Sequence, residues 1–546
     1  MRVPKVLLVC SPYASIDRPA LGVSLLKAQL LRLDIACDVA YLNVGFAGRL
    51  GRDEYARVAE APCLALAGDW TFARALWDRD LLDPRSYIEE VLGPMSDGCR
   101  DGVQAVLRAR SLAPAFIEAV LHELPWTEYG VVGFSSSAFQ NVAALGLARR
   151  VKETFPAITI VFGGQNWYGK LGRTLHRLMP FVDFALSGEA DDSLPRLIQL
   201  LAQDSGGGLD SVPGLSSRRA RNPQRATPEL PTGDLDGLAD PDYSDFFDWR
   251  ARDTSLSSDP PVLPMETSRG CWWACRRGCS FCALNRRGIA YRTKSRDRIL
   301  LEMDGLVKRW PGHPIEIVDN IVSPGFLDEV VPRLAARPDR PRISFKVRPD
   351  TPLRRLRSIA TANASLMCGI ESLSDNVLAL MDKGVTSLQN VTFLERCRSL
   401  GIPVDWNLLY GAPGECPEDY TSQVELIASL PFLEPPDAVA PIILERGSAM
   451  WRESAERGFG TPRPAAAYRH VYPFAEADLA DIAFFFEHDY RMSFTLSLRV
   501  AQLVRAVRAW RVRTGPAELS RESRQGPAPS PCLGFAPGLP EGSRPH

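Results

Sequence analysis

Short apolar runs alternate with amphipathic stretches along residues 1–205. Runs such as Val6–Cys10 and Val131–Phe134 predict buried strands, and Leu21–Leu33 has the periodicity of a helix. Residues 45–128 interrupt this alternation and predict a helical insertion. Strands that alternate with helices indicate a doubly wound parallel sheet, whose ligands bind at the carboxyl ends of the strands. The other elements predicted for this sheet are strands 38–42, 158–162 and 181–186 and helices 143–154 and 193–201.

A second alternating block follows a segment that is rich in helix-breaking residues. Residues 206–256 contain many Gly, Pro, Ser and Asp residues and predict a linker. Residues 257–445 contain six apolar runs with helical stretches between them, which predicts a partial (β/α)6 barrel. Residues 446–512 predict a helical C-terminal region, and residues 513–546 predict a disordered tail dominated by Pro, Gly, Ser and Arg. The six barrel strands are expected at 262–266, 315–318, 343–347, 366–370, 404–410 and 438–443.

Composition and charge narrow the class of protein. The chain has 546 residues, too many for one ordinary domain, and its 45% hydrophobic and 24% charged residues are typical of a globular protein. Lys and Arg together number 64 and Asp and Glu 65, so charge indicates neither a nucleic-acid partner nor an acidic tail. No apolar run approaches the roughly 20 residues that span a bilayer, and Val6–Cys10 is too short for a signal peptide. We therefore expect a cytoplasmic protein with no membrane partner.

Four of the 12 cysteines lie in one short loop. Cys271, Cys275, Cys279 and Cys282 follow the predicted strand 262–266, and the other eight are scattered. In a cytoplasmic chain such a cluster indicates metal binding rather than disulfides. Three thiolates can hold three irons of a 4Fe–4S cluster and leave the fourth iron for S-adenosylmethionine (SAM), although four cysteines could instead hold zinc. The spacing allows C-x3-C-x2-C from Cys275 or C-x7-C-x2-C from Cys271.

The loop and several strand ends resemble a known family. Ser268–Trp273 and Cys279–Asn285 are similar to the radical SAM maturases of ribosomally synthesised, post-translationally modified peptides. The resemblance implies that Cys271, Cys279 and Cys282 hold the cluster. Ala274-Cys275 departs from the family pattern, so Cys275 stays an alternative ligand. Further similar segments are Val318–Asn320, Cys368–Ser374, Met381–Thr386, Trp406–Glu415 and His470–Phe474.

The resemblance also implies a cobalamin-binding role for the N-terminal sheet, ahead of a radical SAM barrel. Glycines and small hydroxyl residues at strand ends would let the backbone approach a corrin. The chain has no Asp-x-His-x-x-Gly motif, so we do not expect histidine as the lower ligand of cobalt. Polar residues at the barrel strand ends suit SAM recognition. The residues expected to bind SAM are Phe281, Asp319, Lys346, Glu371 and Asn407, and those expected to bind cobalamin are Ser135, Ser136, Ser137, Gly163, Gly164, Gly188 and Glu189.

The activity implied by the resemblance is C-methylation of a residue in a precursor peptide. In this chemistry a 5′-deoxyadenosyl radical removes hydrogen from an unactivated carbon, and methylcobalamin then supplies the methyl group. The implied partners are the peptide and an electron donor. The alternatives are cobalamin-assisted rearrangement or cyclisation, methylation of a small molecule, and a zinc-stabilised peptide-binding protein without turnover.

Overall fold

The chain folds into two compact units, each made of two stretches of sequence. The first unit combines residues 1–260 with 464–484, and the second combines residues 261–463 with 485–546. The computed structural model describes residues 3–95, 100–203, 208–218, 227–253, 259–284 and 290–514. Nearly all of the predicted disordered tail lies outside the described residues, as do Cys99, Cys532 and Asn285. The disorder of the tail therefore stays a prediction.

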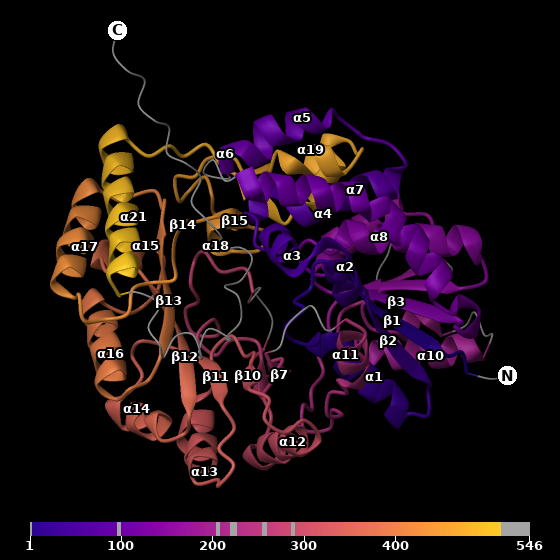
Figure 1. Ribbon diagram of the computed structural model, residues 1–546, viewed down its shortest axis with the longest axis horizontal. Helices are drawn as coiled ribbons and strands as arrows, with labels where there is room; N and C mark the ends of the chain where they lie inside the picture. Colours follow the sequence, from indigo (N-terminus) through magenta and orange to yellow (C-terminus); the bar gives the residue numbers. More distant parts are fainter. Residues whose placement is uncertain are drawn as a thin grey trace. The chain divides into compact units, whose positions relative to one another are not determined.

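A six-stranded sheet forms the centre of the first unit (Figure 1). Its strands lie in the order β2-β1-β3-β4-β5-β6, and all neighbours are parallel except β5 and β6. All five residues of β1 are buried, as expected for a strand that is covered on both faces. The predicted doubly wound α/β fold is confirmed. The strands are β1 (Val6–Cys10), β2 (Cys37–Tyr41), β3 (Val131–Ser135), β4 (Thr159–Gly163), β5 (Phe184–Leu186) and β6 (Leu215–Ser217).

Several helices of the first unit lie between β2 and β3, where the sequence predicts a helical insertion. Their aromatic side chains share one core, because the ring centroid of Phe46 lies 5.0 Å from that of Phe72 and 4.9 Å from that of Phe116. The helices between these two strands are α2 (Leu42–Leu50), α3 (Arg52–Ala59), α4 (Ala67–Trp77), α5 (Pro84–Tyr87), α6 (Gly93–Met95) and α7 (Arg100–Glu123). The helices beside the sheet are α1 (Leu21–Arg32), α8 (Asn141–Thr154), α9 (Gly169–Leu178) and α10 (Ser193–Ala202).

The segment predicted as a linker contains two elements of the first unit. Strand β6 completes the sheet, and helix α11 (Ser244–Ala251) lies against β2, where Asp245 accepts hydrogen bonds from Lys27 Nζ at 2.6 Å and from Val39 N at 2.9 Å. The chain reaches β6 through Gly214, at which φ is +68° and a Cβ atom would lie 2.0 Å from the carbonyl oxygen of Ser187. The linker prediction for residues 206–256 is therefore corrected at these two elements.

Residues 464–484 belong to the first unit although they follow the second sheet in the chain. They contain α19 (Ala467–Val471) and α20 (Glu476–Ile482), and α19 lies beside α4 (Figure 1). Asn141 Nδ2 donates a hydrogen bond to Tyr472 Oη at 2.8 Å, and Trp77 Nε1 donates one to the carbonyl oxygen of Val471 at 2.8 Å. The predicted helical C-terminal region is thus divided between the two units.

A second sheet of six parallel strands forms the centre of the second unit. Its order is β7-β10-β11-β12-β13-β14, which confirms the predicted partial barrel. The strands are β7 (Leu263–Met265), β10 (Ile315–Ile317), β11 (Ile343–Val347), β12 (Ala364–Glu371), β13 (Val404–Tyr410) and β14 (Ala438–Pro441). Shorter strands are β8 (Ser268–Arg269), β9 (Arg292–Thr293), β15 (Leu444–Glu445), β16 (Arg463–Pro464) and β17 (Phe485–Glu487).

Helices cover one face of this second sheet (Figure 1). Phe345 of β11 packs on Phe326 at a centroid distance of 5.4 Å, and Trp406 of β13 packs on Trp510 of α21 at 6.2 Å. Alternate residues of these strands therefore point away from the helices. The helices are α12 (Arg296–Arg309), α13 (Val331–Ala335), α14 (Leu353–Ala360), α15 (Asp375–Leu380), α16 (Ser387–Ser399), α17 (Pro417–Ser429), α18 (Ala449–Arg452) and α21 (Phe494–Thr514).

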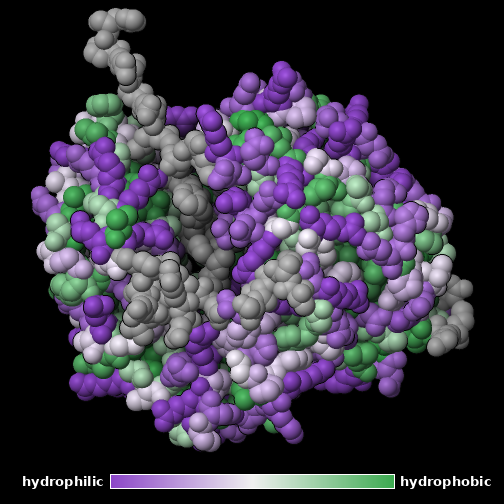
Figure 2. All heavy atoms as spheres, in the orientation of Figure 1, coloured by the Kyte–Doolittle hydropathy of each residue, from purple (hydrophilic) through white to green (hydrophobic). Residues whose placement is uncertain are grey.

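The visible surface is mainly hydrophilic, with hydrophobic residues scattered singly or in small groups (Figure 2). Isolated apolar residues on a surface are normal and need no partner to explain them. Among the described residues, no helix combines the length and the apolar character that crossing a membrane requires.

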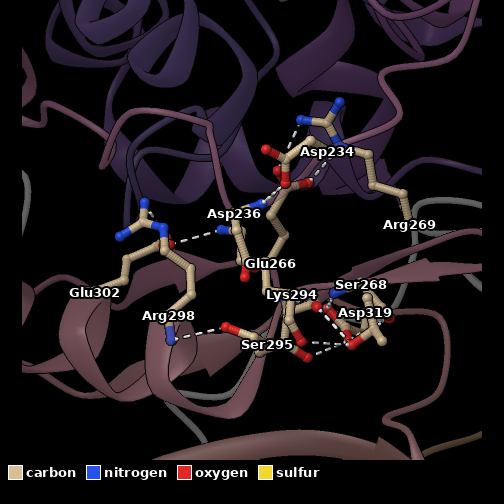
Figure 3. A network of polar contacts seen from close by, with 12 residues as sticks. Asp234, Asp236, Glu266, Ser268, Arg269, Lys294, Ser295, Arg298, Glu302 and Asp319 are labelled. Atoms are coloured by element: carbon tan, nitrogen blue, oxygen red, sulfur yellow. Dashed lines mark hydrogen bonds and ion pairs between the residues drawn. The ribbon is translucent and has the colours of Figure 1, made fainter.

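One ion pair of the second unit is completely buried (Figure 3). Lys294 Nζ lies 2.7 Å from Glu302 Oε2, and both side chains are 0% exposed. Arg298 also approaches the same carboxylate, at 3.3 Å. The pair joins the segment after β9 to the first turns of α12.

We expect Lys294→Met to lower the free energy of unfolding by about 3 kcal/mol, because the buried Glu302 carboxylate would lose the cation that lies 2.7 Å from it. The double variant Lys294→Met/Glu302→Leu should recover most of this loss, since neither buried charge remains. Urea denaturation followed by tryptophan fluorescence measures the stability of the unchanged chain and of both variants. Lys308→Met, at an exposed position of α12, is the matched control and should unfold like the unchanged chain. Equal midpoints for the Lys294 and Lys308 single variants would contradict this assignment.

Candidate functional site

The cysteine loop begins just after β7 and returns beside its own start. Ser268 and Arg269 of β8 pair with Thr293 and Arg292 of β9 in an antiparallel ladder. The backbone N–H of Lys294 donates a further hydrogen bond to the carbonyl oxygen of Thr267 at 2.8 Å. The two ends of the loop are thus tied together before the first cysteine is reached.

Asp319, at the end of β10, holds this base of the loop (Figure 3). Its Oδ1 accepts from the N–H groups of Thr267 at 2.7 Å and Ser268 at 3.1 Å, and its Oδ2 accepts from both hydroxyls at 2.6 Å. Burial raises the pKa of Asp319, and the hydrogen bonds from Ser268 and Thr267 act against that rise. Because a carboxylate has about four acceptor positions, these bonds fill it. The structure therefore gives Asp319 a role in holding the loop, and its contact with SAM stays a prediction.

The four cysteines of the loop differ in exposure. Cys271 is buried, Cys279 and Cys282 are half-buried, and Cys275 is exposed. Burial raises the pKa of the Cys282 thiol to about 12, and the nearby Cys279 and Cys271 act in the same direction. Burial also raises the pKa of Cys279, where Cys271 is again among the neighbours that raise it. The structure thus brings Cys271, Cys279 and Cys282 near one another and directs Cys275 to solvent.

The thiols fit an iron–sulfur cluster by their chemistry, although they are not converged on one metal position. Among the described residues, no three His, Cys, Asp or Glu side chains form a group that could hold a metal ion. Cluster ligands bind as thiolates, so a cluster would have to displace the thiol protons that burial favours. Three neighbouring thiols on one tied loop are the donor set that three irons of such a cluster require.

Two predicted SAM residues lie on strands of the second sheet that are separated by β12. Lys346 on β11 and Asn407 on β13 alternate with the residues that pack against the helices, so they lie on the opposite face. Asn407 Oδ1 is buried and accepts no hydrogen bond from the described residues. A buried acceptor without a donor is costly, and a bound ligand would supply one. This orphaned oxygen is the observation that favours a ligand on this face.

Glu371 and Phe281, also predicted to bind SAM, are joined by a residue with no predicted role. Glu371 ends β12 after an irregularity in its pairing with β13 and has φ +60°. Its Oε1 accepts from Lys383 Nζ at 3.0 Å, and the same ammonium lies 5.8 Å from the ring centroid of Phe281. Lys383 lies in the family-like segment Met381–Thr386, which is the signal that could have pointed to it.

The residues predicted to bind cobalamin lie at the carboxyl ends of three adjacent parallel strands. Ser135 and Gly163 are the last residues of β3 and β4. Ser136 and Ser137 follow β3, Gly164 follows β4, and Gly188 and Glu189 follow β5. Gly164 has φ +93°, and a Cβ atom there would lie 2.5 Å from the carbonyl oxygen of Ser136. Only glycine allows these two loops to approach so closely.

Two of these predicted residues are already used inside the protein. Ser136 is fully buried, and its hydroxyl donates to Asn141 Oδ1 at 3.2 Å. Asn141 Oδ1 also accepts from Trp167 Nε1 at 3.0 Å, while its amide donates to Tyr472. Glu189 Oε2 accepts from the N–H of Thr232 at 2.9 Å. Ser136 and Glu189 thus help to hold the loops, a role that strand-end position alone could not reveal.

Comparison with known proteins agrees with this arrangement. Residues 268–427, which run from β8 into α17, match the profile of the radical SAM superfamily. These residues form a radical SAM domain. The domain begins at the Ser268 that Asp319 holds and includes the cysteine loop, Glu371, Lys383 and Asn407.

The chain is similar in part of its sequence, and in its fold, to proteins named for related chemistry. It is 29% identical over 298 residues to the hopanoid C-3 methylase of Methylococcus capsulatus, covering 53% of this chain and 54% of that protein. The fold matches the cobalamin-dependent SAM radical enzyme OxsB with a TM-score of 0.62 and 16% identity, over 91% of this chain and 66% of OxsB. It also matches the methyltransferase TsrM of Kitasatospora setae with tryptophan and a SAM analogue bound, with a TM-score of 0.55 and 15% identity, over 93% and 89%. The chain therefore spans about half of the methylase and less than two thirds of OxsB.

The cofactors predicted from the sequence are those of the similar structures. OxsB is solved with cobalamin and SAM, and TsrM with cobalamin and a 4Fe–4S cluster. The radical SAM domain around the cysteine loop favours iron–sulfur over the zinc alternative.

We expect Cys271→Ala to lose most of the iron that the chain takes up on anaerobic reconstitution with iron and sulfide, because a buried ligand near Cys279 and Cys282 is removed. Cys275→Ala is the matched control, since the exposed Cys275 should not contribute a ligand. Iron and sulfide analysis together with the visible spectrum measures both variants. Iron lost from Cys275→Ala and kept by Cys271→Ala would reverse the assignment.

We expect Asp319→Asn to lower the free energy of unfolding by about 1–3 kcal/mol, because an amide nitrogen cannot accept the hydrogen bonds of two buried donors. The loosened loop should also take up less iron on reconstitution. Asp297→Asn changes an exposed aspartate of α12 and should affect neither property. Iron uptake by Asp319→Asn equal to that of the Asp297 variant would show that the loop does not depend on this carboxylate.

Proposed function

We propose that the chain is a cobalamin-dependent radical SAM C-methyltransferase. The observation that carries the proposal is the tied cysteine loop, which lies within the matched radical SAM domain at the end of β7. The doubly wound sheet of the first unit supplies the second part of such an enzyme, and the fold of OxsB and TsrM supports this combination.

The roles of the barrel residues follow from their chemistry. Cys271, Cys279 and Cys282 would hold the cluster, and the Asn407 oxygen and the Glu371 carboxylate are acceptors suited to the hydroxyl and ammonium groups of SAM. Lys346 suits the methionine carboxylate, and Phe281 offers an apolar contact next to the cluster ligand Cys282. With cluster, SAM and cobalamin bound, these groups would supply hydrogen abstraction from an unactivated carbon and methyl transfer to it.

The first unit is proposed to bind cobalamin at the carboxyl ends of β3, β4 and β5. Ser135, Ser137, Gly163, Gly164 and Gly188 leave room there for a large planar group. A histidine is not proposed as the lower ligand of cobalt. His176 is buried, its Nδ1 lies 2.9 Å from Ser216 Oγ, and burial lowers its pKa to about 4. The side chain is thus occupied within the protein.

Two substrate classes are proposed, each from a different observation. The family-like segments around the cysteine loop favour a residue of a ribosomal precursor peptide. The hopanoid methylase and TsrM, named for a hopanoid and solved with tryptophan, favour a small molecule instead. Unactivated sp3 carbons of either class are not nucleophilic, so methylation of such a carbon would call for the same radical chemistry in both. An electron donor is the further partner in either case.

The test uses the full chain, reconstituted anaerobically with iron, sulfide and hydroxocobalamin and incubated with trideuteromethyl-labelled SAM and dithionite. We expect 5′-deoxyadenosine to form and labelled methyl to appear on cobalamin, as measured by mass spectrometry. If an iron-replete chain forms neither 5′-deoxyadenosine nor labelled methylcobalamin, the proposal is refuted. Cys271→Ala is the control for the radical product.

The same mixture then distinguishes the two substrate classes. One arm contains a pool of synthetic precursor peptides, and the other a low-molecular-weight extract of the producing cells. A labelled methyl gain in a peptide supports the peptide class, and a labelled methyl gain in the extract supports the small-molecule class.

A further inference from the structure

A buried lysine, Lys383, lies beside the cysteine loop. Lys383 is 7% exposed, and its ammonium lies 3.0 Å from Glu371 Oε1 and 5.8 Å from the ring of Phe281. Phe281 stands between Cys279 and Cys282 in the loop, so the ammonium lies beside the part of the loop that carries these cysteines. One side chain therefore touches a predicted SAM ligand and lies near a predicted cluster ligand.

The backbone around this pair is shaped to admit it. A Cβ atom at Gly369 would lie 2.5 Å from Lys383 Nζ and 2.8 Å from Glu371 Oε1, so the ends of both side chains occupy the space that a methyl group would need. Glu371 itself has φ +60°, a conformation that residues with side chains rarely adopt. Such a backbone persists only where its surroundings hold it, and here the bond to Lys383 is part of that hold.

The segment that carries Lys383 also contacts the cysteine loop on both sides of Cys279. Ser280 N donates to the carbonyl oxygen of Met381 at 3.0 Å, and its hydroxyl donates to that of Leu380 at 3.2 Å. On the other side, a Cβ atom at Gly384 would lie 2.5 Å from the ring of Trp273, so this ring lies against the Gly384 backbone.

Arg348 contacts both the cysteine loop and the segment that carries Lys383. Its guanidinium lies 3.7 Å from the centroid of the Trp273 ring, and its Nη2 donates to the carbonyl oxygen of Lys383 at 3.3 Å. Arg348 is 5% exposed, so a second buried cation is held within the same small group of residues. Movement of the 380–384 segment would therefore move the loop and both cations together.

We propose that Lys383 is a positioning residue that couples SAM binding to the cluster. Lys383 binds one oxygen of Glu371 and so orients the carboxylate, whose other oxygen is then available to the ammonium group of SAM. Lys383 also places a positive charge beside Cys279. A nearby cation favours the cluster state that carries one more electron, because charge and hydrogen bonding set the reduction potential. This inference rests on the proposed function of the cysteine loop.

The test compares four reconstituted full-length proteins: the unchanged chain, Lys383→Met, Gly369→Ala and Lys308→Met. The methionine keeps the length of lysine without its charge, and Gly369→Ala keeps both charges but forces the ends of Lys383 and Glu371 to shift. Lys308→Met removes an exposed lysine of α12 as the matched control. Three properties are measured without substrate: iron per chain, the dissociation constant for SAM, and the midpoint potential of the cluster in a dithionite titration followed by electron paramagnetic resonance.

We expect Lys383→Met to weaken SAM binding about tenfold, as loss of a supporting partner around a metal site commonly does. Its midpoint potential should become more negative, because the added electron loses a nearby cation. Gly369→Ala should weaken SAM binding as well, and Lys308→Met should change neither property. If Lys383→Met does not retain iron, the comparison of Gly369→Ala with the control decides.

The results separate this inference from the proposed function. Iron-loaded Lys383→Met or Gly369→Ala with the SAM affinity and the potential of the control would overturn the role of Lys383 and leave the cluster in place. An unchanged chain that takes up no iron would overturn the proposed function instead.

Discussion

Four hydrogen bonds to one buried carboxylate set the position of the base of the cysteine loop. Asp319 accepts the N–H and hydroxyl groups of Thr267 and Ser268, and these residues lead directly to Cys271. A buried carboxylate with unfilled acceptor positions would cost more than it contributes, whereas a filled one is rigid and directional. The loop can therefore carry exposed residues such as Cys275 at its tip while its base keeps one position.

The same principle recurs at the other contacts of the loop. The returning chain is fixed by the buried pair Lys294–Glu302, and the middle of the loop is held through Ser280 and Trp273 to the segment that carries Lys383. A site that must bind both a cluster and a small cofactor gains from this, because groups held in place before binding lose little entropy on binding. The buried charges near the cysteines thus serve geometry first, and their electrostatic effect on bound groups follows from the same placement.

Much of the architecture could be predicted because buried strands have a simple signature. Val6–Cys10 is an apolar run, Val404–Tyr410 begins with apolar and polar residues in alternation, and both are strands with the predicted bounds. The loop of four cysteines could also be predicted, because they lie within twelve residues after a predicted strand. Strand β6 was missed because Leu215–Ser217 is short and rich in serine, and it forms only because Gly214 lets the chain approach β5. Pairs such as Glu371 with Lys383 could not be predicted, since no local pattern tells which charged residues will be buried together.

The division of the chain shows why a domain cannot always be read as one stretch of sequence. Residues 464–484 follow the second sheet, yet Tyr472 is bonded to Asn141, which also holds Trp167 and Ser136. The loops proposed to bind cobalamin are thus supported by a residue that lies beyond the radical SAM domain in the chain. Because the tyrosine is 5% exposed and its partner 4%, removing this segment would leave buried polar groups without partners. The first unit is therefore complete only with residues 464–484, which come after the second sheet in the chain.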